Sequence, residues 1–245
     1  MTGKKPKAET ITLPCLSARF RTKTEWEALT SDQIDLFNRV VVCRTYKAGQ
    51  TIFLQDDPCK GLYVVEDGLV AVRKVDDEGQ SAIVRLAHQG DTLGYRPLLA
   101  GESHRASAEV VQDARTCFID AATMRGFLLT NPKLGMRFLE HTAQALGGAE
   151  ERLFQVAALS VRTRIIHLLI LLRNHYGTTS SDGTLFVELP MSRRDLADMI
   201  GARPESVSRS LRDIQNEGIL NLSGRTVRID QVDRLVNELH TALHH

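Results

Sequence analysis

Glu205, Ser208 and Arg209 are the residues of this chain whose types and spacing point most directly to a chemistry. They are three and four positions apart, so on a helix they share one face. On such a face arginine can hydrogen-bond O6 and N7 of a guanine, and glutamate can accept from N4 of a cytosine. These residue types therefore suit the reading of neighbouring base pairs in double-stranded DNA. A Glu205–Arg209 ion pair that only stabilises a solvated helix is the alternative.

Two short amphipathic helices must position these side chains, between Ser192 and Gln215. Apolar residues at helical spacing give each helix one inward face: Leu196, Ala197 and Ile200, then Val207, Leu211 and Ile214. Gly201 supplies a permissive backbone for the turn between them. This pattern predicts a helix-turn-helix, whose second helix enters the major groove. We expect the following outward residues to contact DNA: Ser192, Arg193, Arg203, Glu205, Ser206, Ser208, Arg209 and Arg212.

A small hairpin is expected after the second helix, over Asn221–Asp230. Two helices followed by a two-stranded wing make a winged helix, and here the sequence resembles the Crp/Fnr family of bacterial transcription regulators over nearly the whole chain. Glu205-Ser-Val-Ser-Arg209 is similar to the E-x-x-S-R recognition signature of the Fnr branch, whereas the cyclic-AMP receptor branch has R-E-x-x-x-R. The resemblance implies half-sites similar to TTGAT in an inverted repeat.

Short β-rich runs separated by turns fill the chain from Val40 to about Asp120, after a helix expected over Glu25–Arg39. The eight runs are 40–46, 51–54, 61–65, 69–74, 81–86, 92–94, 106–111 and 114–119. One of the turns is read at Glu66-Asp-Gly68. Eight such runs predict a double-sheet jelly roll, and the glycine spacing resembles the cyclic-nucleotide-binding fold of the same family.

A long amphipathic helix is predicted from Asn131-Pro132 to about Leu159. In the family the corresponding helix pairs with its copy, and an inverted-repeat site requires two copies, so a homodimer is expected. The predicted fold class is α+β, with a β-roll, a dimerisation helix and a winged helix-turn-helix. The expected divisions are a flexible tail (1–24), a sensory β-roll (25–130), a dimerisation helix and hinge (131–160) and a DNA-binding domain (161–245).

The segment Gly94–Ala108 matches the phosphate cassette of the cyclic-AMP receptor, which carries G-E-L and then R-S-A. Tyr95 stands where the family has a glutamate that accepts from a ribose hydroxyl, and Ala106 stands in place of the serine. Cyclic AMP is therefore not the expected ligand. The predicted effector pocket for another small anion consists of Gly94, Tyr95, Arg96 and Arg105. The alternative is that the two arginines are surface charges.

The four cysteines, Cys15, Cys43, Cys59 and Cys117, offer a second sensing chemistry. Arg115-Thr-Cys-Phe-Ile-Asp120 is similar to the V-C-E-I-P of Fnr, where the cysteine holds a four-iron cluster together with N-terminal cysteines. The resemblance implies a 4Fe-4S cluster held by all four, although the tail around Cys15 has no C-x-x-C. The alternatives are a thiol or disulfide switch, haem ligation by His88 or His104, or cysteines that only pack in the core.

Composition agrees with a DNA-binding protein whose charge is local. The 245 residues carry a formal net charge of only +1, and every basic residue after Lys133 is an arginine or histidine. No stretch approaches a membrane span, so we expect a cytoplasmic protein without membrane contact and without structural disulfides. No catalytic motif is recognisable, so an enzyme is not expected. The expected partners are double-stranded DNA, a second copy and RNA polymerase; a cyclic-nucleotide-binding module without a DNA role is the competing class.

Overall fold

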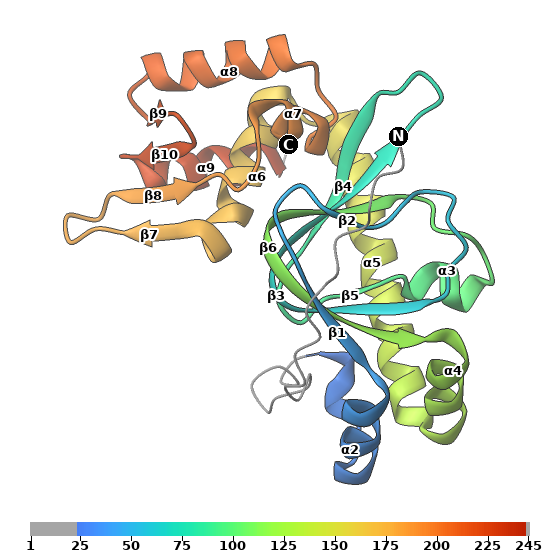
Figure 1. The fold of residues 1–245 in the computed structure, drawn as a ribbon. Helices are drawn as coiled ribbons and strands as arrows, with labels where there is room; N and C mark the ends of the chain where they lie inside the picture. Colours follow the sequence, from blue (N-terminus) through green and yellow to red (C-terminus); the bar gives the residue numbers. More distant parts are fainter. Residues whose placement is uncertain (1–23, 244–245) are drawn as a thin grey trace. The chain divides into compact units, whose positions relative to one another are not determined.

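The computed structural model describes residues 24–243, which divide into two compact units. The boundary lies between Leu146 and Gly147, inside the long helix α5 (Pro132–Ala158; Figure 1). We call the part before this boundary the β-roll unit and the part after it the helix-turn-helix unit. Among the helices of residues 24–243, none has the length and apolarity to cross a membrane.

The β-roll unit is built around two long antiparallel strands, β3 (Gly61–Val75) and β6 (Ser107–Asp120) (Figure 1). One end of this pair is flanked by β1 (Val42–Tyr46) and β5 (Thr92–Leu93), and the other end by β2 (Thr51–Phe53) and β4 (Ser81–Ala87). Long strands that change partners along their length join two layers into one roll. Apolar residues from these strands fill its interior, including Phe53, Val65, Val70, Leu93 and Val110. The double-sheet β-roll is thus confirmed.

The eight predicted runs form six strands, so two of the expected interruptions are wrong. At Glu66–Gly68 the chain does not turn back, because β3 continues through register shifts against β6. Gly68 has a φ of 89°, and a Cβ there would lie 2.3 Å from the Asp113 carbonyl oxygen. The glycine therefore serves a close backbone approach inside a bulged strand rather than a hairpin turn.

The single helix expected over Glu25–Arg39 is also wrong, because the chain is extended at Leu29 and Thr30 between two separate helices. A 3-10 helix η1 (Glu25–Ala28) precedes α2 (Ser31–Val40), and the Thr30 side chain accepts from Gln33 N in a capping box. Trp26 is fully buried, its indole donates to Thr92 Oγ1 at 3.0 Å, and its ring packs edge-on against Phe138 of α5. Two further helices complete this unit: α3 (Tyr95–Ala100) and α4 (Ala121–Thr130).

The helix-turn-helix unit contains the end of α5 and α6 (Val161–Tyr176), then α7 (Arg193–Met199) and α8 (Pro204–Asn216). The expected wing is present as β9 (Leu220–Ser223) and β10 (Thr226–Ile229). The wing belongs to a larger antiparallel sheet in the order β7-β8-β10-β9, with β7 (Gly177–Thr179) and β8 (Leu185–Glu188), and α9 (Val232–Leu243) follows. Sequence reasoning did not find β7, β8 or α9.

Candidate DNA-binding surface and cysteine site

The helix α8 separates an apolar face from a polar one as its sequence predicts. Val207, Leu211 and Ile214 are at most 4% exposed, and Pro204 begins the helix. The predicted contact residues on the other face, from Arg203 to Arg212, are exposed, apart from the half-buried Ser206. Within residues 24–243, Glu205 and Arg209 make no ion pair, so their charged groups are open to a ligand.

The first helix of the motif, α7, is held at both ends. At its start, the hydroxyl of Ser192 accepts from Asp195 N at 3.1 Å, so this predicted contact residue is the N-cap of the helix, with exposed Arg193 beside it. At its end, Arg164 of α6 donates through Nη1 to the carbonyl oxygens of Ile200 at 2.5 Å and Gly201 at 3.2 Å. The guanidinium thus satisfies carbonyls that a helix end leaves without partners, where positive charge is also favoured.

A second arginine of α6 ties the end of α8 to α9. Arg162 donates to both carboxylate oxygens of Glu217 at 2.7 and 2.8 Å, and it also pairs with Glu238. Arg234 joins the same network 3.3 Å from Glu217. The hydrogen bonds to Glu238 and Glu217 raise the pKa of Arg162, and the Arg162 hydrogen bond lowers the pKa of Glu217. The two arginines of α6 therefore fix where both helices of the motif lie within this unit.

The predicted effector segment combines a buried tyrosine with two exposed arginines. Gly94 takes a left-handed conformation before α3, and Tyr95 is only 9% exposed, with its ring 4.6 Å from that of His141. Arg96 is exposed. Arg105 is engaged by Glu102 through two hydrogen bonds of 2.9 and 3.0 Å. Tyr95 has no carboxylate that could accept from a ribose hydroxyl. The guanidinium of Arg105, which would bind a phosphate, is already hydrogen-bonded to the Glu102 carboxylate.

The two histidines considered as haem ligands have other surroundings. His104 is 3% exposed and stacks on Phe53 with ring centroids 3.8 Å apart, and burial lowers its pKa. His88 lies in a turn with Nδ1 4.0 Å from Asp91 Oδ2. The packing of His104 is that of a core residue.

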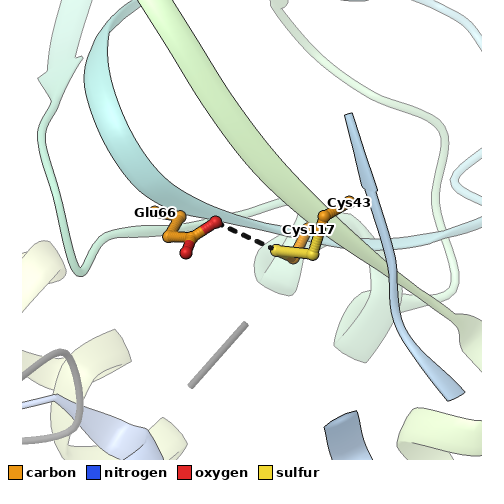
Figure 2. Close-up of side chains that lie close together, drawn as sticks. All are labelled: Cys43, Glu66 and Cys117. Atoms are coloured by element: carbon orange, nitrogen blue, oxygen red, sulfur yellow. Dashed lines mark hydrogen bonds between the residues drawn. A yellow bond between two sulfur atoms is a disulfide. The ribbon is translucent and has the colours of Figure 1, made fainter. Parts of the chain in front are cut away.

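Cys43 and Cys117 form a disulfide between neighbouring strands (Figure 2). They are direct partners in the β1–β6 register, with Cα atoms 3.9 Å apart, and are 7% and 0% exposed. The expectation of no structural disulfide is therefore wrong for this pair. The two residues are separated by 74 positions, so only the strand register brings them together.

Glu66 points at this disulfide from β3 (Figure 2). It lies at the register shift between Val65 and Asp67, and its Oε2 is 3.7 Å from Cys117 Sγ and 2.5 Å from Arg115 Nη1. Burial raises the pKa of Glu66, while the Arg115 charge acts in the opposite direction. One ligand atom each from Cys43, Glu66 and Cys117 lies within 4.8 Å of the others.

The donor atoms of the described residues do not fit a four-thiolate cluster. Cys59 is outside the group just described, and its thiol donates to the carbonyl oxygens of Gly61 and Gly94 at 3.5 and 3.6 Å. Burial raises the pKa of the Cys59 thiol, which disfavours the thiolate that iron requires. Cys15, the fourth predicted ligand, lies outside the described residues.

Comparison with known proteins gives both units a family. A cyclic nucleotide-binding domain model matches residues 43–131, and a Crp-like helix-turn-helix domain model matches residues 163–238. Together these two domains support a DNA-binding regulator of the Crp/Fnr type. This Crp/Fnr regulator is 29% identical over 171 residues to the nitrogen fixation regulation protein FixK of Azorhizobium caulinodans, covering 70% of this chain and 68% of that one.

Two further relatives span more of the regulator. The transcriptional activator protein FnrL of Cereibacter sphaeroides is 24% identical over 233 residues, which cover 94% of this chain and 93% of that protein. The solved structure of FixK2 from Bradyrhizobium japonicum superposes with a TM-score of 0.69 at 27% identity, covering 81% of this chain and 96% of that one. A DNA-binding transcription regulator of the Crp/Fnr type is thus supported by sequence and by fold.

Sequence reasoning missed three residues that organise the two candidate sites: Arg162, Arg164 and Glu66. The two arginines are two residues apart at the start of an apolar helix, and the sequence gives no sign of their partners. The sequence predicts a turn at Glu66, and a turn gives its side chain no expected direction. Contact of the predicted residues with DNA, and of the effector segment with a ligand, stays a prediction.

Proposed function

We propose that this regulator binds double-stranded DNA as a homodimer at an inverted repeat of TTGAT-like half-sites, with α8 in the major groove. The observation that carries the proposal is the exposed face of Glu205, Ser208 and Arg209 on a helix whose opposite face is buried. Arg209 reads the guanine of the half-site, and Glu205 accepts from a cytosine N4. Arg193 and Arg212 contact phosphates and position the helix.

The DNA assignment is tested by anisotropy titration of labelled duplexes at several salt concentrations. We expect the inverted repeat to be bound on the order of 1,000-fold more tightly than a scrambled duplex of equal composition, with affinity for both falling as salt rises. Loss of affinity with salt but no preference between the two duplexes would refute sequence-specific reading.

A second copy of the chain is the proposed partner for α5. Leu139, Leu146 and Leu153 recur every seven residues along this helix and are 59%, 61% and 72% exposed. A seven-residue apolar period is that of a two-helix coiled-coil seam, and a two-fold partner suits an inverted repeat. RNA polymerase is the further proposed partner of the DNA-bound dimer.

Light scattering on the purified protein tests the dimer. Leu146→Glu places a charge at the centre of the seam and is expected to give a monomer. Leu129→Glu is the matched control, because Leu129 is 84% exposed on α4, outside the seam. A dimer that survives Leu146→Glu would contradict the assignment of α5.

The signal we propose is redox or gas chemistry at the cysteines of the β-roll unit, and cyclic AMP is not proposed as the effector. The Cys43–Cys117 pair supports thiol chemistry. A four-iron cluster would require Cys59 and Cys15 to join this pair, and assays of iron and acid-labile sulfide on protein purified without oxygen test for it. A colourless protein without iron or sulfide would leave thiol chemistry, or a small ligand near Tyr95 and Arg105, as the signal.

A further inference from the structure

The Cys43–Cys117 disulfide stands at an edge of the β-roll sheet beside a carboxylate that the DNA-binding proposal does not use. Among residues 24–243, strand β1 pairs only with β6, so within this range Cys43 is on an edge strand. Edge strands open more readily than central ones because fewer contacts hold them. Reduction of the disulfide therefore need not disrupt the two long strands at the centre of the roll.

We propose that Cys43 and Cys117 are a reversible dithiol–disulfide pair oxidised by a small hydroperoxide, with Glu66 as the group that takes the thiol proton of Cys117. The link from this chemistry to transcription rests on the proposed DNA-binding function, whereas the chemistry itself does not. Three observations carry the inference: the strand register, the direction of Glu66 and the limited access to the sulfurs.

The register makes the cross-link available without a large backbone movement, because the two cysteines face each other across one strand pair. The register shift in β3 leaves Glu66 outside regular pairing with β6, and its Oε2 lies 3.7 Å from Cys117 Sγ. In the dithiol state that distance allows the Cys117 S–H to donate to the carboxylate. Arg115 and Asp67 are the charged neighbours that act on Glu66, and Arg115 holds the carboxylate in place at 2.5 Å.

The chemistry balances with one hydroperoxide. Glu66 takes the Cys117 proton, the thiolate attacks a peroxide oxygen, an S–O bond forms and the O–O bond breaks. The leaving hydroxide or alkoxide takes the proton from Glu66 and departs as water or alcohol. The Cys43 sulfur then attacks the sulfenic sulfur, the S–S bond forms, and water leaves with the Cys43 proton. Two thiols lose two electrons and the peroxide gains them; a small dithiol reverses the oxidation by thiol exchange.

Access to the sulfurs favours a small reagent. Cys117 is fully buried and Cys43 is 7% exposed, whereas the side chains of Glu66 and Arg115 are 20% and 17% exposed. The partly open side of the site is thus the side with the proton acceptor.

The disulfide shares a core with the beginning of α5. Cys43 and Cys117 belong to the same buried cluster as Trp26, Phe37 and Phe138. Strand β1 follows α2 directly, so freeing Cys43 loosens the attachment of α2 and η1, whose aromatic side chains pack beneath α5. Because α5 is the proposed dimer helix, the two redox states are expected to differ in DNA affinity.

The test is the rate at which fully reduced protein loses thiols to hydrogen peroxide under argon, with the Cys43–Cys117 peptide pair identified by mass spectrometry. Glu66→Gln is expected to slow formation of this disulfide on the order of 100-fold, the lower range for a positioned proton acceptor. Glu109→Gln is the matched control, because Glu109 makes a comparable β6–β3 ion pair with Arg73 at 3.0 Å. Equal rates for the two variants, or peroxide oxidation that joins other cysteines, would overturn the inference.

A parallel DNA titration separates the two proposals. Wild-type protein is expected to bind the inverted repeat with different affinities in its reduced and oxidised states, and Cys43→Ser to bind with one affinity under both conditions. If no state prefers the inverted repeat over scrambled DNA while the Glu66 effect holds, the proposed function fails and the redox chemistry stands. If the sequence preference holds while Glu66→Gln oxidises like Glu109→Gln, only the redox inference fails.

Discussion

Arg164→Met removes a guanidinium that caps the end of α7 while keeping most of the side-chain stem. The wild-type Nη1 serves two carbonyl oxygens, those of Ile200 at 2.5 Å and Gly201 at 3.2 Å. Hydrogen bonds from a charged donor contribute about 1.5–3 kcal/mol each. The buried Nε of Arg164 has no hydrogen-bond partner within residues 24–243, and removing it returns about 1–3 kcal/mol. The net loss expected for local stability is therefore about 2 kcal/mol.

Amide hydrogen exchange followed by mass spectrometry measures this loss where it occurs. Peptides from α7 and its turn are expected to exchange about 30-fold faster in Arg164→Met, since 1.4 kcal/mol corresponds to a factor of ten. Arg228→Met is the matched control, because Arg228 is an exposed arginine of β10 paired with Asp230 at 2.8 Å, and such surface pairs contribute about 0–1 kcal/mol. Exchange in α7 that matches the control would refute the capping role of Arg164.

Three further predictions concern other parts of the chain. Arg209→Ala is expected to weaken binding to the inverted repeat by about 1–3 kcal/mol and to relax the preference for guanine. Arg225→Ala in the wing is the control, and it is expected to weaken binding to the inverted repeat and to the scrambled duplex equally. Equal losses on both duplexes for Arg209→Ala would show that Arg209 does not read a base. Arg162 lowers the pKa of Glu217, so the stability this pair contributes is present above the ordinary glutamate pKa and is lost as the pH falls through the lower folded value. Glu217→Gln should therefore reduce the loss of hydrogen-exchange protection in α8 as the pH is lowered. The same pH-dependent loss in the variant and the wild type would contradict this. Gly68→Ala is expected to destabilise the β-roll unit by about 1–3 kcal/mol, because φ is 89° and the new Cβ would meet the Asp113 carbonyl oxygen. Urea denaturation followed by Trp26 fluorescence measures this loss. A stability equal to that of the wild type would show that the bulge adjusts to the added Cβ without cost.

The helix-turn-helix could be predicted because its determinants are local. Ser192 caps α7, Pro204 opens α8, and the buried stripe from Val207 to Ile214 sets the face of α8, all within about two dozen residues. The start of α5 at Pro132 was predictable for the same reason. In these segments the period of apolar residues and the caps agree, so local sequence suffices.

The cysteine site could not be predicted because it depends on the register of a whole sheet. Cys43 and Cys117 meet only after β1 pairs with β6, and Glu66 reaches them only because β3 continues past Gly68 instead of turning. A short polar run that ends in glycine is typical of a turn and also of a bulge, so composition alone does not distinguish the two. Arg164 was missed for a similar reason, since its partners are backbone carbonyls 36 and 37 residues away.

The most direct test of sequence-specific DNA binding is a competition titration of the wild-type protein, in its reduced and its oxidised state, against inverted-repeat and scrambled duplexes at one fixed salt concentration. The predicted result is a preference for the inverted repeat on the order of 1,000-fold in at least one redox state. Equal affinity for the two duplexes in both states would contradict the assignment of α8 as a recognition helix.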